Sequence, residues 1–161
     1  TAKLIQENLM ELRTHCIVEI EKHIFGDCVR FARAHCNVTP IWDDFYCLPP
    51  TGHYDCVFCD PYDYGIAESG TASHQEGLFS DYCRKMAAAS TQHLRLGGVL
   101  CFPSFGDGEL PLLDGYRRVV SGEWQDQTGL RLWDGTLCLR GQLGYYERLA
   151  SVDDDGRECQ A

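Results

Sequence analysis

The chain has 161 residues, 44% of them hydrophobic and 11% aromatic, which is enough for one domain with a buried core. Its formal charge of −10, from 14 basic and 24 acidic residues, disfavours binding to nucleic acid or to an anionic membrane. No apolar run reaches the roughly 18 residues that a membrane helix needs, and no signal peptide is visible, so we expect a cytoplasmic protein.

The first third of the chain predicts alternating helices and strands. Apolar residues recur at helical spacing in two segments, and short β-branched runs follow each of them. The predicted elements are a helix over 2–13, a strand over 16–19, a helix over 22–35 and a strand over 38–42. A Pro-Pro-Thr-Gly loop then ends this part of the chain.

The remainder continues the alternation and then becomes richer in strands. The predicted elements are a strand over 54–60, a helix over 74–95 ended by Gly97–Gly98, a strand over 99–102, and an antiparallel pair over 117–124 and 142–150. This order predicts an α/β fold, a doubly wound and mostly parallel sheet with helices on both faces. We expect one domain over 1–150 and an acidic, flexible tail over 151–161.

Ten cysteines raise the question of a metal site or disulfides. Cys56 and Cys59 form a C-x-x-C, but three steps along a strand place them on opposite faces, and no second ligand pair is evident. We therefore predict no metal and reduced thiols. Half of the cysteines lie in apolar runs and are expected to pack as small hydrophobic side chains. These are Cys16, Cys56, Cys59, Cys101 and Cys138.

Three successive strands end in an acidic residue, at Glu19, at Trp42-Asp43-Asp44 and at Asp60-Pro61-Tyr62. Parallel strands end along one rim of a sheet, where open α/β sheets bind ligands, so Glu19, Asp43 and Asp60 are expected to share a cleft. A carboxylate there suits ribose hydroxyls, an adenine amine or a cationic substrate. Each acid has a simpler interpretation as a residue that caps a helix or lies in a loop.

A nucleotide-binding α/β unit normally opens with a strand and a Gly-rich turn. Here a helix comes first, and no segment matches G-x-G-x-x-G. We expect the chain to be a fragment of a longer protein, or else that another segment supplies the first strand.

Several segments resemble, in register over about residues 1–150, the class I S-adenosylmethionine-dependent methyltransferases. Within that class the resemblance is to guanidinoacetate N-methyltransferase and the related fungal-type arginine methyltransferase 2. The similar segments are His15–Glu19, Ile41–Asp44, Thr51–Asp55 leading to Asp60-Pro61-Tyr62, Leu94–Leu100, Gly115–Arg118 and Tyr145-Tyr146.

The resemblance implies a Rossmann-like sheet whose last strands are antiparallel, and an N-methyltransferase with S-adenosylmethionine as cofactor. Its acceptor would be a guanidino group, on a small molecule such as guanidinoacetate or on arginine in a protein. The implied cofactor contacts are Glu19, Ile20, Trp42, Asp43 and Asp60, with Glu19 at the ribose and Trp42 and Asp43 at the adenine. Asp60 and Tyr62 would act on the methyl acceptor.

The chain departs from the family at three points. The Gly-rich loop is missing, Asp60-Pro61 replaces Asp-Thr, and Asp43 replaces a glutamate. Three alternatives therefore stay open. One is a catalytically silent, methyltransferase-like scaffold. Another is an amino-methyltransferase of the Asp-Pro-Pro-Tyr type acting on another amine, and the weakest is a nicotinamide-dependent dehydrogenase.

Overall fold

The computed structural model describes residues 2–8, 12–50, 54–59, 72–105, 110–125 and 140–150. The chain forms two compact units, Thr1–Pro50 and Thr51–Ala161. The predicted limits of the domain stay a prediction, and the acidic tail over 151–161 lies outside the described residues. None of the described helices is long and apolar enough to cross a membrane.

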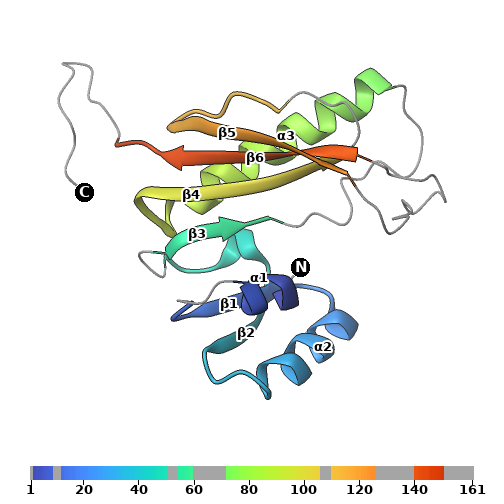
Figure 1. The fold of residues 1–161 in the computed structure, drawn as a ribbon, viewed down its shortest axis with the longest axis vertical. Helices are drawn as coiled ribbons and strands as arrows, with labels where there is room; N and C mark the ends of the chain where they lie inside the picture. Colours follow the sequence, from blue (N-terminus) through green and yellow to red (C-terminus); the bar gives the residue numbers. More distant parts are fainter. Residues whose placement is uncertain are drawn as a thin grey trace. The chain divides into compact units, whose positions relative to one another are not determined.

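The first unit is a parallel strand pair with a crossover helix (Figure 1). Its elements are α1 (Ala2–Asn8), β1 (His15–Glu19), α2 (Lys22–Ala32), β2 (Val38–Trp42) and the 3₁₀ helix η1 (Phe45–Cys47). The register runs from His15↔Val38 to Glu19↔Trp42, so both strands end at the same edge. Among the described residues β2 pairs only with β1, which suits Pro40 in β2, because proline has no N–H for a second ladder.

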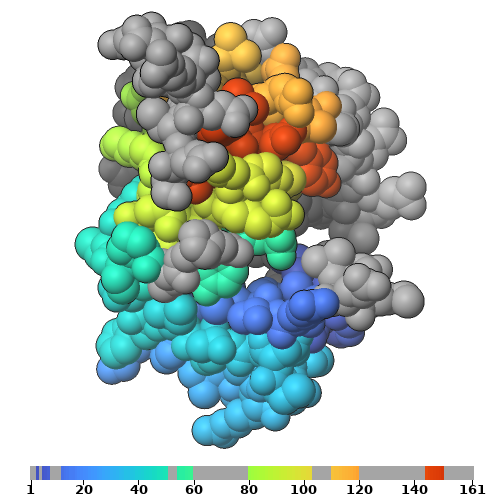
Figure 2. Space-filling model, turned by 90° about the vertical axis from the view of Figure 1, so that its left-hand side faces the viewer, coloured from blue at the N-terminus to red at the C-terminus, as the bar shows by residue number. Residues whose placement is uncertain are grey.

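The second unit is a four-stranded sheet with one long helix across a face (Figure 1). Its elements are β3 (Tyr54–Phe58), α3 (Ala72–Thr91), β4 (Leu94–Phe105), β5 (Tyr116–Gln125) and β6 (Arg140–Arg148). The strand order is β3-β4-β6-β5, with β3 parallel to β4 and β6 antiparallel to both of its neighbours. The surfaces of β4 (yellow), β6 (red) and β5 (orange) follow one another in that order in Figure 2. The predicted antiparallel pair at the end of the chain is confirmed.

Aromatic side chains from α3, β4 and β6 make the core of the second unit. Phe102 and Tyr146 are both 0% exposed. The ring of Phe102 meets those of Tyr82 and Tyr146 edge to face, with ring centres 6.3 and 5.9 Å apart. The Tyr146 hydroxyl donates to the carbonyl oxygen of Pro111 at 2.8 Å, so this buried polar group is satisfied. Burial raises the pKa of Tyr146 to about 12.

The predicted helices are too long at their C-terminal ends. Residues 12 and 13 lie outside any helix, α2 ends at Ala32 rather than at 35, and α3 ends at Thr91 rather than at 95. After α3 the chain pairs at once with β3, because the carbonyl oxygen of His93 accepts the N–H of Tyr54 at 2.9 Å. The strand pairing therefore ends the helix earlier than its own sequence indicates.

The prediction that Gly97–Gly98 ends α3 is wrong, because both glycines lie inside β4. The register of β3 against β4 shifts there, since Tyr54 pairs with Leu94 but Cys56 pairs with Val99. Gly97 has a φ of +71°, and a Cβ on Gly98 would lie 2.8 Å from the carbonyl oxygen of Arg95. The glycine pair thus forms a bulge that other residues would strain.

The predicted burial of the cysteines is correct for two of the five and wrong for Cys56. Cys59 and Cys101 are buried, and burial raises the pKa of Cys101 to about 12. Cys56 is exposed and Cys16 half-buried, whereas Cys138 lies outside the described residues. In the part of the chain that the structure describes, no group of three His, Cys, Asp or Glu side chains could hold a metal ion.

His93, between α3 and β4, makes stability depend on pH. It is 2% exposed, and burial lowers the pKa of its imidazole. Because the unfolded chain binds a proton at this imidazole more tightly than the folded chain does, the folded state has its full stability above about pH 6.5. It loses stability as the pH drops below that value. We expect the urea concentration at the midpoint of unfolding to be lower at pH 5.5 than at pH 7.5. This decrease should be smaller in His93→Gln.

The exposed neighbour Gln92, which carries no titratable group, provides the matched control, and Gln92→Ala should respond to pH as the parent chain does. If His93→Gln and the parent lost the same stability between the two pH values, the role of His93 would be refuted.

Candidate functional site

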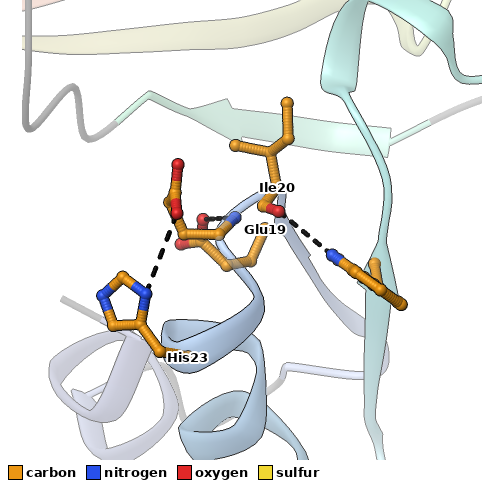
Figure 3. A network of polar contacts seen from close by, with 5 residues as sticks. Glu19, Ile20 and His23 are labelled. Atoms are coloured by element: carbon orange, nitrogen blue, oxygen red, sulfur yellow. Dashed lines mark hydrogen bonds and ion pairs between the residues drawn. The ribbon is translucent and has the colours of Figure 1, made fainter.

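Glu19 is the last residue of β1, and its carboxylate is half-buried. Its Oε1 accepts a hydrogen bond from the backbone N–H of Glu21 at 2.8 Å (Figure 3). Glu21 precedes α2 and makes no capping bond with its own side chain. Glu19 therefore supports the start of the helix through one oxygen, while Oε2 makes no hydrogen bond within the described residues.

The ends of β1 and β2 are joined by a bond between Trp42 and Ile20. The indole N–H of Trp42 donates to the carbonyl oxygen of Ile20 at 3.0 Å (Figure 3). The two side chains remain exposed, at 55% for Trp42 and 58% for Ile20. Because its only donor is occupied, Trp42 can offer a ligand its ring face but no hydrogen bond.

The two acids after β2 have different roles. Asp44 is the N-cap of η1, and its Oδ1 accepts the N–H of Tyr46 at 3.0 Å. Asp43 is exposed, and its Oδ1 accepts the N–H of Asp44 at 2.8 Å. Asp44 thus shapes the turn, and Asp43 is the acid that remains open to a ligand.

Four of the five predicted cofactor contacts lie at one edge of the β1–β2 sheet: Glu19, Ile20, Trp42 and Asp43. Asp60 and Tyr62 lie outside the described residues, so their place and the convergence of Asp60 with Glu19 and Asp43 stay predictions. The preceding residue is well anchored, because the N–H of Cys59 donates to the carbonyl oxygen of Cys101 at 2.9 Å. Pairing with β4 thus continues up to the residue before Asp60.

Two residues of α2 that the sequence did not single out surround Trp42. The ring of Phe25 stacks on that of Trp42, with centres 6.0 Å apart and planes 22° apart. The Nζ of Lys22 lies 5.9 Å from the centre of the Trp42 ring. The i, i+3 spacing of Lys22 and Phe25 puts them on one helix face, which was the available signal.

The fold is similar to that of several solved structures, two of which are of one N-methyltransferase. The N-methyltransferase NodS from Bradyrhizobium japonicum WM9 aligns at 13% identity over 92% of this chain and 82% of that chain, with a TM-score of 0.62. NodS in complex with S-adenosyl-l-homocysteine aligns at 12% identity over 84% and 66%, with a TM-score of 0.56. NSun6 from Pyrococcus horikoshii, solved with SFG, aligns at 14% identity over 93% and 44%, with a TM-score of 0.53.

The chain therefore has a Rossmann-like α/β fold of the class I methyltransferase type, as the sequence predicts. No family model matches the chain, and no curated protein matches it in sequence. The resemblance to guanidinoacetate N-methyltransferase rests on the sequence segments alone.

Proposed function

We propose that the protein is an S-adenosylmethionine-dependent N-methyltransferase whose acceptor is a guanidino group, on a small molecule or on arginine in a protein. The observation that carries this proposal is the gathering of Glu19, Ile20, Trp42 and Asp43 at one strand edge. The similarity to NodS, an N-methyltransferase solved with S-adenosyl-l-homocysteine, supports the class of reaction.

The residues at this edge fit the adenosyl group. Ribose hydroxyls donate hydrogen bonds, and Glu19 has a carboxylate oxygen that is not engaged elsewhere in the described residues. A flat base needs apolar faces, which the exposed side chains of Ile20 and Trp42 offer. The exocyclic amine of adenine needs an acceptor, and Asp43 is an exposed carboxylate beside Trp42.

The bound cofactor supplies a methyl group on a positively charged sulfur. An acceptor nitrogen that takes this methyl group would lose a proton to a base held beside it. A guanidinium is a poor nucleophile, because its pKa exceeds about 12 and its electrons are delocalised. Asp60 would orient its N–H groups and accept the proton, with Tyr62 beside the acceptor.

The proposal is tested by calorimetric titration of the chain with S-adenosylhomocysteine. Saturable binding is expected, followed by transfer of a radiolabelled methyl group to guanidinoacetate, free arginine or an arginine-containing protein. Absence of binding, both by this chain and by a longer form that supplies the expected first strand and Gly-rich turn, would refute the proposal and favour the catalytically silent scaffold. Transfer only to other amines would favour the amino-methyltransferase alternative.

Glu19→Ala is expected to weaken binding of S-adenosylhomocysteine by roughly 1–3 kcal/mol, or about 5- to 150-fold, because a charge-assisted hydrogen bond is lost. The matched control is Glu21→Ala, which removes the neighbouring acid but keeps the backbone N–H that Glu19 binds. Its affinity should stay within about twofold of the parent chain. An unchanged affinity of Glu19→Ala would leave Glu19 only its role at the helix start.

A further inference from the structure

We propose that α2 and Trp42 form a docking groove for an acidic amphipathic helix of a partner protein. The groove has a volume of about 520 Å³ and lies within the first unit. Its lining includes Phe25, Gly26, Val29 and Trp42. This inference goes beyond the proposed methyltransferase activity, and the groove shares one residue, Trp42, with the proposed cofactor site.

The lining residues of α2, together with its C-cap residue Arg33, form two parallel rows. Lys22, Gly26 and Arg30 follow one another at a spacing of four, and so do Phe25, Val29 and Arg33. Rows with this spacing lie side by side on one helix face, and a ridge of a second helix packs between them. From Lys22 to Arg33 the groove is about 16 Å long, which corresponds to three helical turns.

Within the described residues of the first unit, no neighbouring atom requires a glycine at position 26. A glycine within a helix costs about 0.5–1 kcal/mol relative to alanine. Its φ is not positive, and a Cβ there would meet only Nη1 of Arg30, at an ordinary 3.8 Å. Omitting the side chain deepens the floor of the groove and lets another backbone come close to α2.

The groove also leaves apolar surface uncovered. No residue of α2 is fully buried, although the helix carries a clear apolar face. Phe25 and Val29 are half-buried, and Trp42 is 55% exposed. Apolar surface that stays open beside charged residues is typical of a site that a partner covers.

The charges around the groove indicate an acidic partner. Residues 1–50 contain five Lys and Arg, and three of them line the groove: Lys22, Arg30 and Arg33. Arg30 is paired with Asp27, whereas Lys22 and Arg33 form no salt bridge within the described residues. Two such cations at opposite ends of an apolar groove complement acids at both ends of a bound helix.

The shape favours a helix over a small molecule. Small-molecule sites enclose about 70–90% of their ligand. This groove is an open trough, and its three cations and Trp42 are all exposed. An amphipathic helix seats its apolar side chains in such a trough at spacings of three and four residues. A nucleic acid would also suit cations and aromatics, but the charge of the whole chain repels it.

The test uses the full chain and a synthetic peptide with a leucine stripe flanked by glutamates, compared with the same peptide carrying glutamine in their place. Fluorescence anisotropy is expected to show saturable binding of the glutamate peptide and at least about tenfold weaker binding of the glutamine peptide. Arg33→Glu should weaken binding of the glutamate peptide at least about tenfold. The control Arg13→Glu, a cation of the same unit outside the groove, should change it less than about twofold.

Gly26→Ala separates docking from folding. The variant should unfold at a higher temperature than the parent, because alanine favours the helix, yet bind the glutamate peptide at least about fivefold more weakly. The proposal would be overturned if neither Arg33→Glu nor Gly26→Ala changed the affinity for the glutamate peptide. It would also be overturned if no saturable binding were seen up to about 1 mM peptide. Binding of a single-stranded oligonucleotide that Arg33→Glu abolishes would overturn it as well.

Discussion

Replacing Asp60 by asparagine is expected to slow methyl transfer at least about 100-fold and to leave the affinity for S-adenosylhomocysteine within about tenfold. Asparagine is nearly isosteric, but it carries no charge to hold a guanidinium and does not accept the proton that the nitrogen loses. Asp60 comes two residues after β3, at the carboxyl end of a strand that is parallel to β4. Ligands of open α/β sheets bind at such ends.

Radiolabel transfer and calorimetry on the same samples measure the two effects separately. Asp55→Asn is the matched control, because Asp55 lies in the same strand and its carboxylate is paired with Arg95 at 2.5 Å. Its transfer rate should stay within about threefold of the parent chain. Equal losses of rate and cofactor affinity in Asp60→Asn would mean that Asp60 holds the cofactor rather than the acceptor.

Some strands could be predicted well from the sequence, because they are short apolar runs between breaking residues. β4 could not, because it begins at Leu94 and ends at Phe105, whereas the apolar run predicts 99–102. β2 begins at Val38 and ends at Trp42 as predicted, since Asn37 precedes the run and the acids at 43 and 44 follow it. The C-terminal ends of the helices could not be predicted from the sequence, because they depend on pairing with residues far away in the chain. The apolar pattern of α3 continues to residue 95, but pairing with Tyr54 draws His93 and Leu94 out of the helix.

Gly97–Gly98 illustrates a local signal with two meanings. A glycine pair after a helical pattern predicts a C-cap, and the same pair inside a strand predicts a bulge. The choice depends on whether β3 pairs on both sides of the glycines, which it does at Leu94 and at Val99. Only the long-range pairing decides between them.

At the candidate site, the sequence predicted the edge and the residue types but not the bonds between them. Strand order alone brings Glu19 and Trp42 to adjacent positions, because they are the last pair of a parallel ladder. The bonds of Glu19 to Glu21 and of Trp42 to Ile20 depend on side-chain rotamers. These bonds decide which side-chain atoms remain available to a ligand. The sequence indicates the residues of the site, and the structure adds which of their atoms are already engaged.

Phe102→Ala is expected to lower the free energy of unfolding by about 3–5 kcal/mol, because a fully buried aromatic side chain is replaced by a cavity. Its edge-to-face contacts with Tyr82 and Tyr146 are lost as well. Urea unfolding of the full chain, followed by circular dichroism, measures the change. Phe102→Leu, which retains most of the volume, should cost less than about 1.5 kcal/mol.

The exposed Leu112 provides the control, and Leu112→Ala should stay within about 0.5 kcal/mol of the parent. A loss below about 1.5 kcal/mol in Phe102→Ala would show that the core closes around the missing ring. The neighbour of Phe102 in β4 is Cys101, whose carbonyl oxygen binds the N–H of Cys59 just before Asp60. Packing of Phe102 against α3 and β6 therefore supports β4, the strand with which β3 pairs up to Cys59, the residue before Asp60.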